Sequence, residues 1–147
     1  MKEFHGRVIQ AQNWTGEAIV SHQGFNTLAS CQTSALLGTS KKIIVSDQNN
    51  KDLYKKNITG KALCLPETIG STTGGMVIQT IAVRSLAPKA WLFSHHIDPL
   101  AASGIILSNV WNDAGLIAID ELGDDFLDAV KSGDKITIKE DGTVIVE

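Results

Sequence analysis

The apolar positions of this chain follow two different patterns in its two halves. In the second half, short and wholly apolar runs at residues 62–65, 90–93 and 116–119 alternate with segments whose apolar residues recur at helical spacing. Such runs are typical of strands that are buried on both faces of a sheet. The order of strands and helices predicts parallel pairing with right-handed crossovers. The predicted helices cover residues 76–83, 98–106 and 124–130.

The first half is rich in β-strand signals but irregular. Strand signals occur at residues 7–12 and 16–20, and the turn-forming link between them predicts a hairpin. Residues 22–40 are small and polar with no clean period, and they are predicted as a loop with one helical turn near 34–37. A brief strand is expected at 43–45.

A second hairpin is predicted at the C-terminus, where Asp141-Gly142 separates alternating segments at 134–139 and 143–146. The chain has 147 residues, of which 43% are hydrophobic, and this suits a single packed domain over residues 1–147. We therefore expect an α/β fold with a mainly parallel sheet in its second half, a β-rich N-terminal part and a C-terminal hairpin.

Charge and composition narrow the classes of function. The net charge is −3 and no basic cluster exceeds a lysine pair, so nucleic-acid binding is not expected. No apolar run approaches the roughly 20 residues of a membrane span, and the N-terminus lacks a signal-peptide core, so we expect a cytoplasmic protein. Cys31 and Cys64 make no metal-binding motif. Cys64 is expected to be buried in its strand and Cys31 to be exposed.

A turn of small residues joins the predicted strand at 62–65 to the helix that follows. It contains three glycines and three hydroxyl side chains, namely Gly70, Ser71, Thr72, Thr73, Gly74 and Gly75. Free backbone amides and the dipole at the start of a helix form a ready anion site. However, Ser and Thr are also ordinary helix caps, and the spacing matches neither a Walker loop nor a dinucleotide fingerprint. From the residues alone, the turn is either an anion site or a plain cap.

Other polar residues give weaker signals. His95 and His96 are adjacent at the end of a strand, so they point to opposite sides and are not expected to share a metal ion. Either histidine could contact a substrate. Asp98 before Pro99 is expected to cap a helix. The acidic cluster near residues 120–125 is expected to be a solvated face.

Five short segments, taken in order, resemble the aconitase X swivel domain. They are Gly16-Glu-Ala-Ile-Val-Ser21, Gly60-Lys-Ala-Leu-Cys-Leu-Pro66, Gly70-Ser-Thr-Thr-Gly74, Ala87-Pro-Lys-Ala90 and Asp98-Pro-Leu-Ala-Ala-Ser-Gly104. The resemblance implies the swivelling β/β/α fold, which agrees with the order of elements above. In that family the domain is either a separate small subunit or one end of a longer chain.

The resemblance implies a hydro-lyase that dehydrates a small hydroxy acid such as mevalonate 5-phosphate or cis-3-hydroxy-L-proline. A large aconitase X subunit would carry the iron–sulfur cluster, and this chain would hold no cofactor and be inactive alone. The active site would lie between the two subunits. Two other hypotheses remain open: a non-catalytic swivel or binding module, and a free-standing anion-binding domain.

The same resemblance assigns roles within the small-residue turn. Ser71 is the candidate base that takes the substrate proton, and the turn would stabilise its alkoxide through backbone amides. Four neighbours are expected to hold a substrate carboxylate or phosphate: Gly70, Thr72, Thr73 and Gly74. A subunit that docks onto another should also expose an apolar patch near this turn.

Overall fold

The computed structural model describes residues 1–36, 40–70 and 73–147. Its strands are β1 (Lys2–His5), β2 (Arg7–Gln10), β3 (Trp14–Val20), β4 (Phe25–Asn26), β5 (Ala62–Leu65), β6 (Thr68–Ile69), β7 (Ala90–Phe93), β8 (Ile117–Asp120), β9 (Lys135–Ile138) and β10 (Thr143–Val146). Its helices are α1 (Thr27–Leu36), α2 (Gly74–Val83), α3 (Pro99–Asn112) and α4 (Asp124–Ala129).

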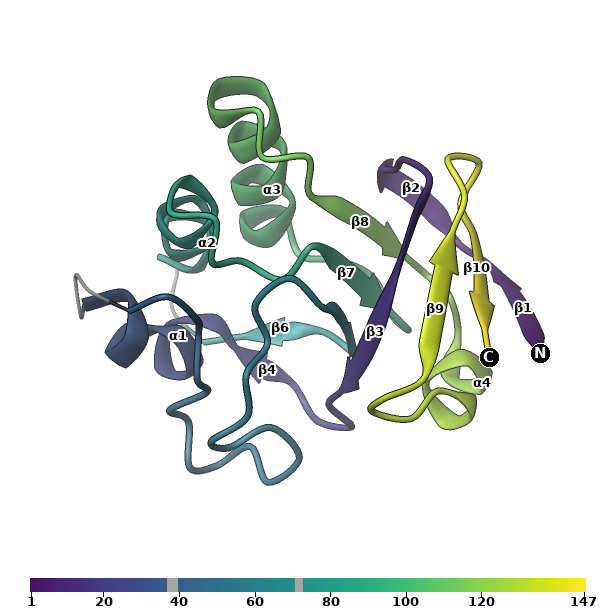
Figure 1. Cartoon of the computed structure of the whole chain (residues 1–147), viewed down its shortest axis with the longest axis horizontal. Helices are drawn as coiled ribbons and strands as arrows, with labels where there is room; N and C mark the ends of the chain where they lie inside the picture. The colour runs from purple at the N-terminus through teal and green to yellow at the C-terminus, as the bar shows by residue number, and fades with distance from the viewer. Residues whose placement is uncertain (37–39, 71–72) are drawn as a thin grey trace.

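The main sheet has the strand order β1-β10-β9-β3-β5-β7-β8-β2. Strands β3, β5, β7 and β8 pair in parallel, which confirms the parallel sheet predicted for the second half. The predicted C-terminal hairpin is confirmed by the antiparallel pairing of β9 with β10. Strands β4 and β6 form a separate small parallel pair beside α1 (Figure 1).

The main sheet curls back on itself. Strands β1 and β2 stand at opposite ends of the strand order, yet only Gly6 separates them in the chain. The chain therefore passes at Gly6 from one edge of the sheet directly to the other. A side chain has no room at this bend, because a Cβ atom on Gly6 would lie 2.5 Å from the carbonyl oxygen of Asp120.

Two apolar cores occupy the two faces of this curled sheet. Alternate strand residues point to opposite faces, as the two-residue period of a strand requires. Leu63 and Trp91 belong to the core that helices α1, α2 and α3 cover. Cys64 and Leu92 belong to the core on the other face, which Phe126 of α4 closes. The parallel strands are therefore apolar throughout, as the sequence predicted.

The hairpin predicted between residues 7–12 and 16–20 is wrong. Strand β2 pairs with β8, whereas β3 lies between β9 and β5. Burial explains the difference, because the end of β3 is buried on both faces and suits the centre of the sheet, while the half-exposed β2 suits its edge. The residues between the two segments do favour a turn, but the burial of each strand determines which strands it pairs with.

The loop predicted for most of residues 22–40 is also wrong, since this segment contains β4 and α1, and the helical turn predicted near 34–37 overlaps only the end of α1. Helix α1 buries small and polar side chains, so the sequence shows no apolar helical stripe. Among these is Cys31, which was expected to be exposed but is fully buried. The strand predicted at 43–45 is reduced to a single antiparallel bridge between Ile44 and Asn57.

Candidate functional site

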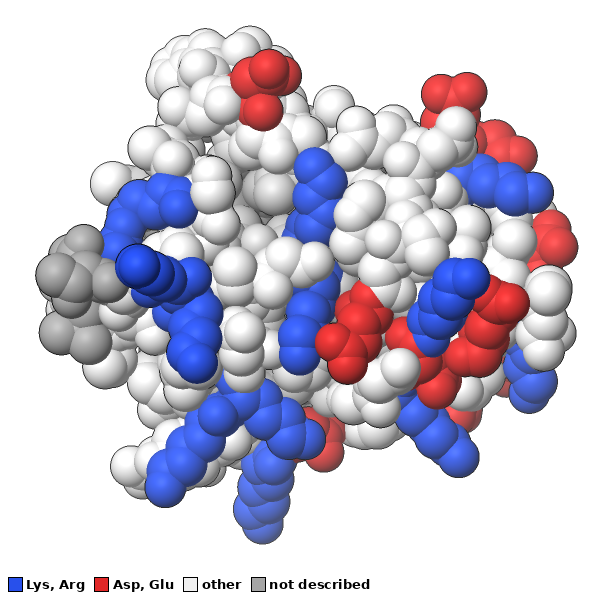
Figure 2. All heavy atoms as spheres, in the orientation of Figure 1, with Lys and Arg blue, Asp and Glu red and all other residues white. Residues whose placement is uncertain are grey.

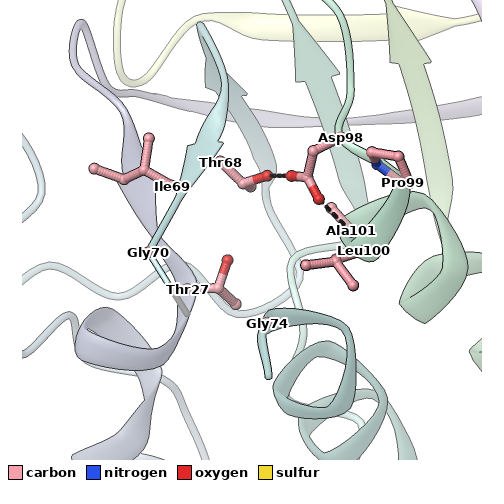
Figure 3. A pocket seen from close by; sticks show the side chains of 9 residues that line it. All are labelled: Thr27, Thr68, Ile69, Gly70, Gly74, Asp98, Pro99, Leu100 and Ala101. Atoms are coloured by element: carbon pink, nitrogen blue, oxygen red, sulfur yellow. Dashed lines mark hydrogen bonds between the residues drawn. The ribbon is translucent and has the colours of Figure 1, made fainter. Parts of the chain in front are cut away.

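A cavity of about 440 Å³ opens beyond the carboxyl ends of β5 and β7, the edge where sheets of this kind bind ligands (Figure 3). Three helices begin at this cavity: α1 at Thr27, α2 at Gly74 and α3 at Pro99. Each helix has at least ten residues, so each directs a partial positive charge toward the cavity. The complete lining is Thr27, Thr68, Ile69, Gly70, Gly74, Asp98, Pro99, Leu100 and Ala101.

One wall of the cavity is closed by a side-chain hydrogen bond between two elements. The hydroxyl of Thr68 on β6 donates to Oδ2 of Asp98, at the start of α3. The other carboxylate oxygen, Oδ1, accepts a hydrogen bond of 2.9 Å from the amide of Ala101. Asp98 is therefore the N-cap of α3, which confirms the role expected from the sequence.

The structure places part of the predicted turn at the cavity. Gly70 and Gly74 both line it. Thr73 lies directly before α2 and lines a neighbouring groove instead. The candidate base Ser71 and its neighbour Thr72 lie outside the described residues.

Thr27 is one of the cavity residues that the sequence did not predict, together with Thr68 and Ile69. Its position follows from Asn26, whose Oδ1 atom accepts a hydrogen bond of 3.0 Å from the amide of Ala29 and so caps α1. Asn is among the preferred residues for this position, so Asn26 was the available signal. Without a periodic apolar stripe behind it, the cap was not recognised as the start of a helix.

Large apolar side chains are exposed at the cavity and in a neighbouring groove, as expected for a docking subunit. Leu36, Ile69 and Met76 are 83%, 51% and 70% exposed, respectively, although all three are large apolar side chains. Leu36 and Met76 also line a groove of about 400 Å³ between α1 and α2. This confirms the prediction of an exposed apolar patch near the turn at residues 70–75.

The charges on the surface are unevenly distributed. Residues 27–89 contain eight Lys or Arg and only three Asp or Glu, although the chain as a whole is acidic. Figure 2 shows Lys and Arg side chains gathered on the side that carries α1 and the segment following it, and acidic side chains mainly around β9 and β10. The half of the molecule that contains α1 and α2 therefore favours the approach of an anion.

A second polar cluster, at the end of β8, corrects the expectation of a wholly solvated acidic face. Asp120 is fully buried, and Arg7 donates to both of its carboxylate oxygens, at 2.9 and 2.6 Å. Burial alone would raise the pKa of Asp120, but the hydrogen bonds from Arg7 and the Ile97 amide and the charge of Arg7 outweigh it, so the pKa is lowered. Because the Ile97 amide binds Asp120 Oδ2 at 2.8 Å, this ion pair also fixes the segment that leads to Asp98.

The sulfur atoms of this chain do not fit the ligand set of an iron–sulfur cluster. Cys31 and Cys64 are both fully buried, one on α1 and the other on β5. Burial raises the pKa of the Cys31 thiol to about 12 and raises that of Cys64 as well, whereas cluster ligands are thiolates. Among the described residues no group of three or more His, Cys, Asp or Glu side chains is placed to hold a metal ion.

No helix among the described residues has the length and apolarity that crossing a bilayer requires. A curled mixed sheet with three helices starting at one cavity defines an α/β domain with a candidate site at the ends of its parallel strands. The sequence profile of the aconitase X swivel domain family matches residues 3–146. The chain therefore belongs to the aconitase X swivel domain family.

Individual relatives agree with this assignment. The phosphomevalonate dehydratase small subunit of Methanocella arvoryzae is 31% identical over 141 residues, which cover 96% of this chain and 94% of that subunit. The phosphomevalonate dehydratase small subunit of Methanocaldococcus jannaschii is 28% identical over 136 residues, covering 92% and 90%. The crystal structure of Thermococcus kodakaraensis aconitase X in its holo-form has a TM-score of 0.83 and 27% identity, and the match covers 100% of this chain and 99% of that chain.

Proposed function

We propose that this chain is the small subunit of an aconitase X-type dehydratase and supplies one wall of an active site that it shares with a large subunit. The observation that carries this proposal is the cavity at which α1, α2 and α3 begin, because it adjoins the turn that holds Ser71. The relatives that are named phosphomevalonate dehydratase small subunits match nearly their whole length, which supports the same role.

In this role Ser71 is the base of the reaction. Its alkoxide removes a proton from a substrate carbon, the C–H electrons form the double bond, and the hydroxyl group leaves from the neighbouring carbon. A serine hydroxyl is a weak acid, so its alkoxide needs stabilisation by amides and positive partial charge. The start of α2, three residues after Ser71, is the source of both.

The large subunit supplies what this chain lacks. The thiols of this chain do not fit an iron–sulfur cluster, so we place the cluster, which assists departure of the hydroxyl group, in the partner. The exposed apolar side chains of Leu36, Ile69 and Met76 form the docking surface, because Ile69 lines the cavity, the other two line the groove beside it, and all three would lose their exposure when the site closes. The substrate is a small hydroxy acid such as mevalonate 5-phosphate or cis-3-hydroxy-L-proline.

The proposal is tested by co-expressing this chain with the large aconitase X subunit of the same organism and assaying both hydroxy acids. We expect dehydration of one substrate by the pair and none by this chain alone. Ser71→Ala should abolish turnover while the subunits still co-purify. Ser103→Ala is the matched control, because Ser103 is exposed on α3.

Two results would contradict the proposal. Normal turnover by the Ser71→Ala pair would remove Ser71 from the mechanism. If this chain remained monomeric in the presence of the large subunit, the shared site itself would be disproved, and a free-standing anion-binding domain would be the better interpretation.

A further inference from the structure

Thr27 is a nearly buried residue whose hydroxyl opens onto the cavity without a hydrogen-bond partner among the described residues. The residue is only 2% exposed and lies at the first position of α1, on the wall of the cavity. Within residues 1–36, 40–70 and 73–147, its hydroxyl makes no hydrogen bond. Figure 3 shows this hydroxyl pointing into the space between Gly74 and the pair formed by Thr68 and Asp98. The residue is held in place by its surroundings, and its free hydroxyl faces an open cavity, so it is available to donate a hydrogen bond to a ligand there.

Gly74 faces Thr27 across the same space. A Cβ atom built on Gly74 would lie 4.0 Å from the Cβ of Thr27, and among the described residues outside its own helix and its chain neighbours no other heavy atom lies as near. The absence of a side chain therefore keeps open a gap between the first residues of α1 and α2. Both helices direct the positive ends of their dipoles toward this gap, and the first amides of a helix lack acceptors within it.

The third helix does not contribute in the same way. The carboxylate of Asp98 already caps α3 and neutralises its positive end. Its second oxygen is occupied by Thr68. The charge of Asp98 also disfavours an anion on that side of the cavity, so an anion is best placed near Thr27 and Gly74.

We infer that Thr27, together with the first turns of α1 and α2, binds an oxyanion of the ligand, either a carboxylate or a phosphoryl group. The Thr27 hydroxyl donates a hydrogen bond to one oxygen, and the helix amides bind the others. Only the identification of this oxyanion as part of the dehydratase substrate rests on the proposed function.

The test begins with this chain alone, titrated separately with inorganic phosphate and acetate while the amide resonances of Thr27 and Gly74 are followed by NMR. We expect one of the two anions to shift both resonances. Thr27→Val keeps the shape of the side chain and should weaken binding about tenfold, the usual effect of losing one hydrogen bond to a charged group. Gly74→Ala should also weaken binding, because its methyl group fills the gap.

The matched control is Thr33→Val, the same substitution at an exposed position of α1. It should bind the anion as the wild type does. If neither anion shifts these resonances, or if Thr27→Val binds as tightly as the wild type, the inference is wrong.

A second measurement separates this inference from the proposed function. In an active complex with the large subunit, Thr27→Val should raise KM about tenfold and change kcat little, because the oxyanion is bound equally in the ground and transition states. An unchanged KM in an active complex would overturn the role of Thr27 and leave the dehydratase proposal intact. Anion binding that depends on Thr27, found in a chain that forms no active complex, would support the site and contradict the dehydratase proposal.

Discussion

At the scale of single residues, the cavity depends on a glycine that no other residue replaces easily. Gly70 has a φ of +103°, a conformation that L side chains rarely adopt. A Cβ atom at this position would lie 2.8 Å from the side chain of Asn26. Asn26 is also the cap of α1, so Gly70 affects the helix that carries Thr27 as well as its own turn.

We therefore expect Gly70→Ala to destabilise the protein by about 1–3 kcal/mol through backbone strain and displacement of the cap. Gly133→Ala is the matched control, because Gly133 has a φ of +99° with no atom within 4 Å of the added Cβ. It should show the strain alone. Urea unfolding of both variants gives the comparison. Equal losses in the free energy of unfolding would show that the Asn26 side chain moves aside without destabilising the protein.

At the scale of elements, α2 and α3 approach each other through a pair of glycines. A Cβ atom on Gly104 would lie 2.5 Å from the carbonyl oxygen of Gly75, and one on Gly75 would lie 2.5 Å from that of Leu100. These contacts involve backbone atoms, which a rotamer change cannot relieve. The close approach keeps the first turns of α2 and α3 beside the same cavity.

Gly104→Ala should therefore separate the two helices and lower the free energy of unfolding by about 1–3 kcal/mol, in spite of the better helix propensity of Ala. Gly74→Ala adds the same methyl group to α2 where there is space, and its effect on stability should stay within about 0.5 kcal/mol. Thermal unfolding of the two variants checks this expectation. A Gly104→Ala protein as stable as the Gly74→Ala protein would contradict the close packing.

The elements that the sequence predicted are those with strong local signals. Strands β5 and β7 are continuous apolar runs, and Asp98-Pro99 marks the start of α3 with a cap. Of helix α1 only the last turn was predicted, because the buried face of the helix consists of small and polar side chains. The candidate site was found in part, since Gly70 and Gly74 lie on a turn with a local signal, whereas Thr27 depends on α1.

The pairing of distant strands could not be predicted by the same means. Strands β2 and β8 are far apart in the chain and pair in the curled sheet, and no turn residue in the sequence indicates that they pair. Asp120 looked like part of a solvated acidic cluster because Glu121, Asp124 and Asp125 follow it in the sequence, and only the pairing with β2 brings Arg7 to it. Its burial is therefore a property of the folded molecule and not of the local sequence.

At the scale of the whole molecule, the ion pair between Arg7 and Asp120 joins the N-terminal part of the chain to the edge of the parallel sheet. Arg7 lies directly after the bend at Gly6, where the chain crosses between the two edges of the sheet. Asp120 ends β8 and also binds the Ile97 amide, close to the cavity. The closure of the sheet and the shape of the candidate site therefore depend on the same buried carboxylate.

This carboxylate should make the stability depend on pH. Because the folded-state pKa of Asp120 is lowered below its ordinary value of 3.8, its contribution is fully present well above that pH. The contribution is lost as the pH falls below 3.8 and through the folded-state pKa, since the unfolded chain then binds the proton first. The exposed Asp141, whose pKa is lowered by its hydrogen bonds to Thr143, titrates in the same direction. A substitution is therefore needed to isolate Asp120.

Asp120→Asn should lower the free energy of unfolding at pH 7 by about 1–3 kcal/mol, because the charge-assisted hydrogen bonds are weakened within a buried site. Its difference from the wild type should shrink as the pH falls below 3.8, because protonation of the carboxyl group in the unfolded chain then removes the advantage of the ionised carboxylate. Asp128→Asn is the control, since it removes the same charge from the exposed face of α4. The measurement is the free energy of unfolding of the wild type and both variants, obtained by denaturant unfolding at several pH values. A difference between Asp120→Asn and the wild type that stays constant with pH would mean that the loss comes from altered packing and that the charge of Asp120 does not hold the sheet closed.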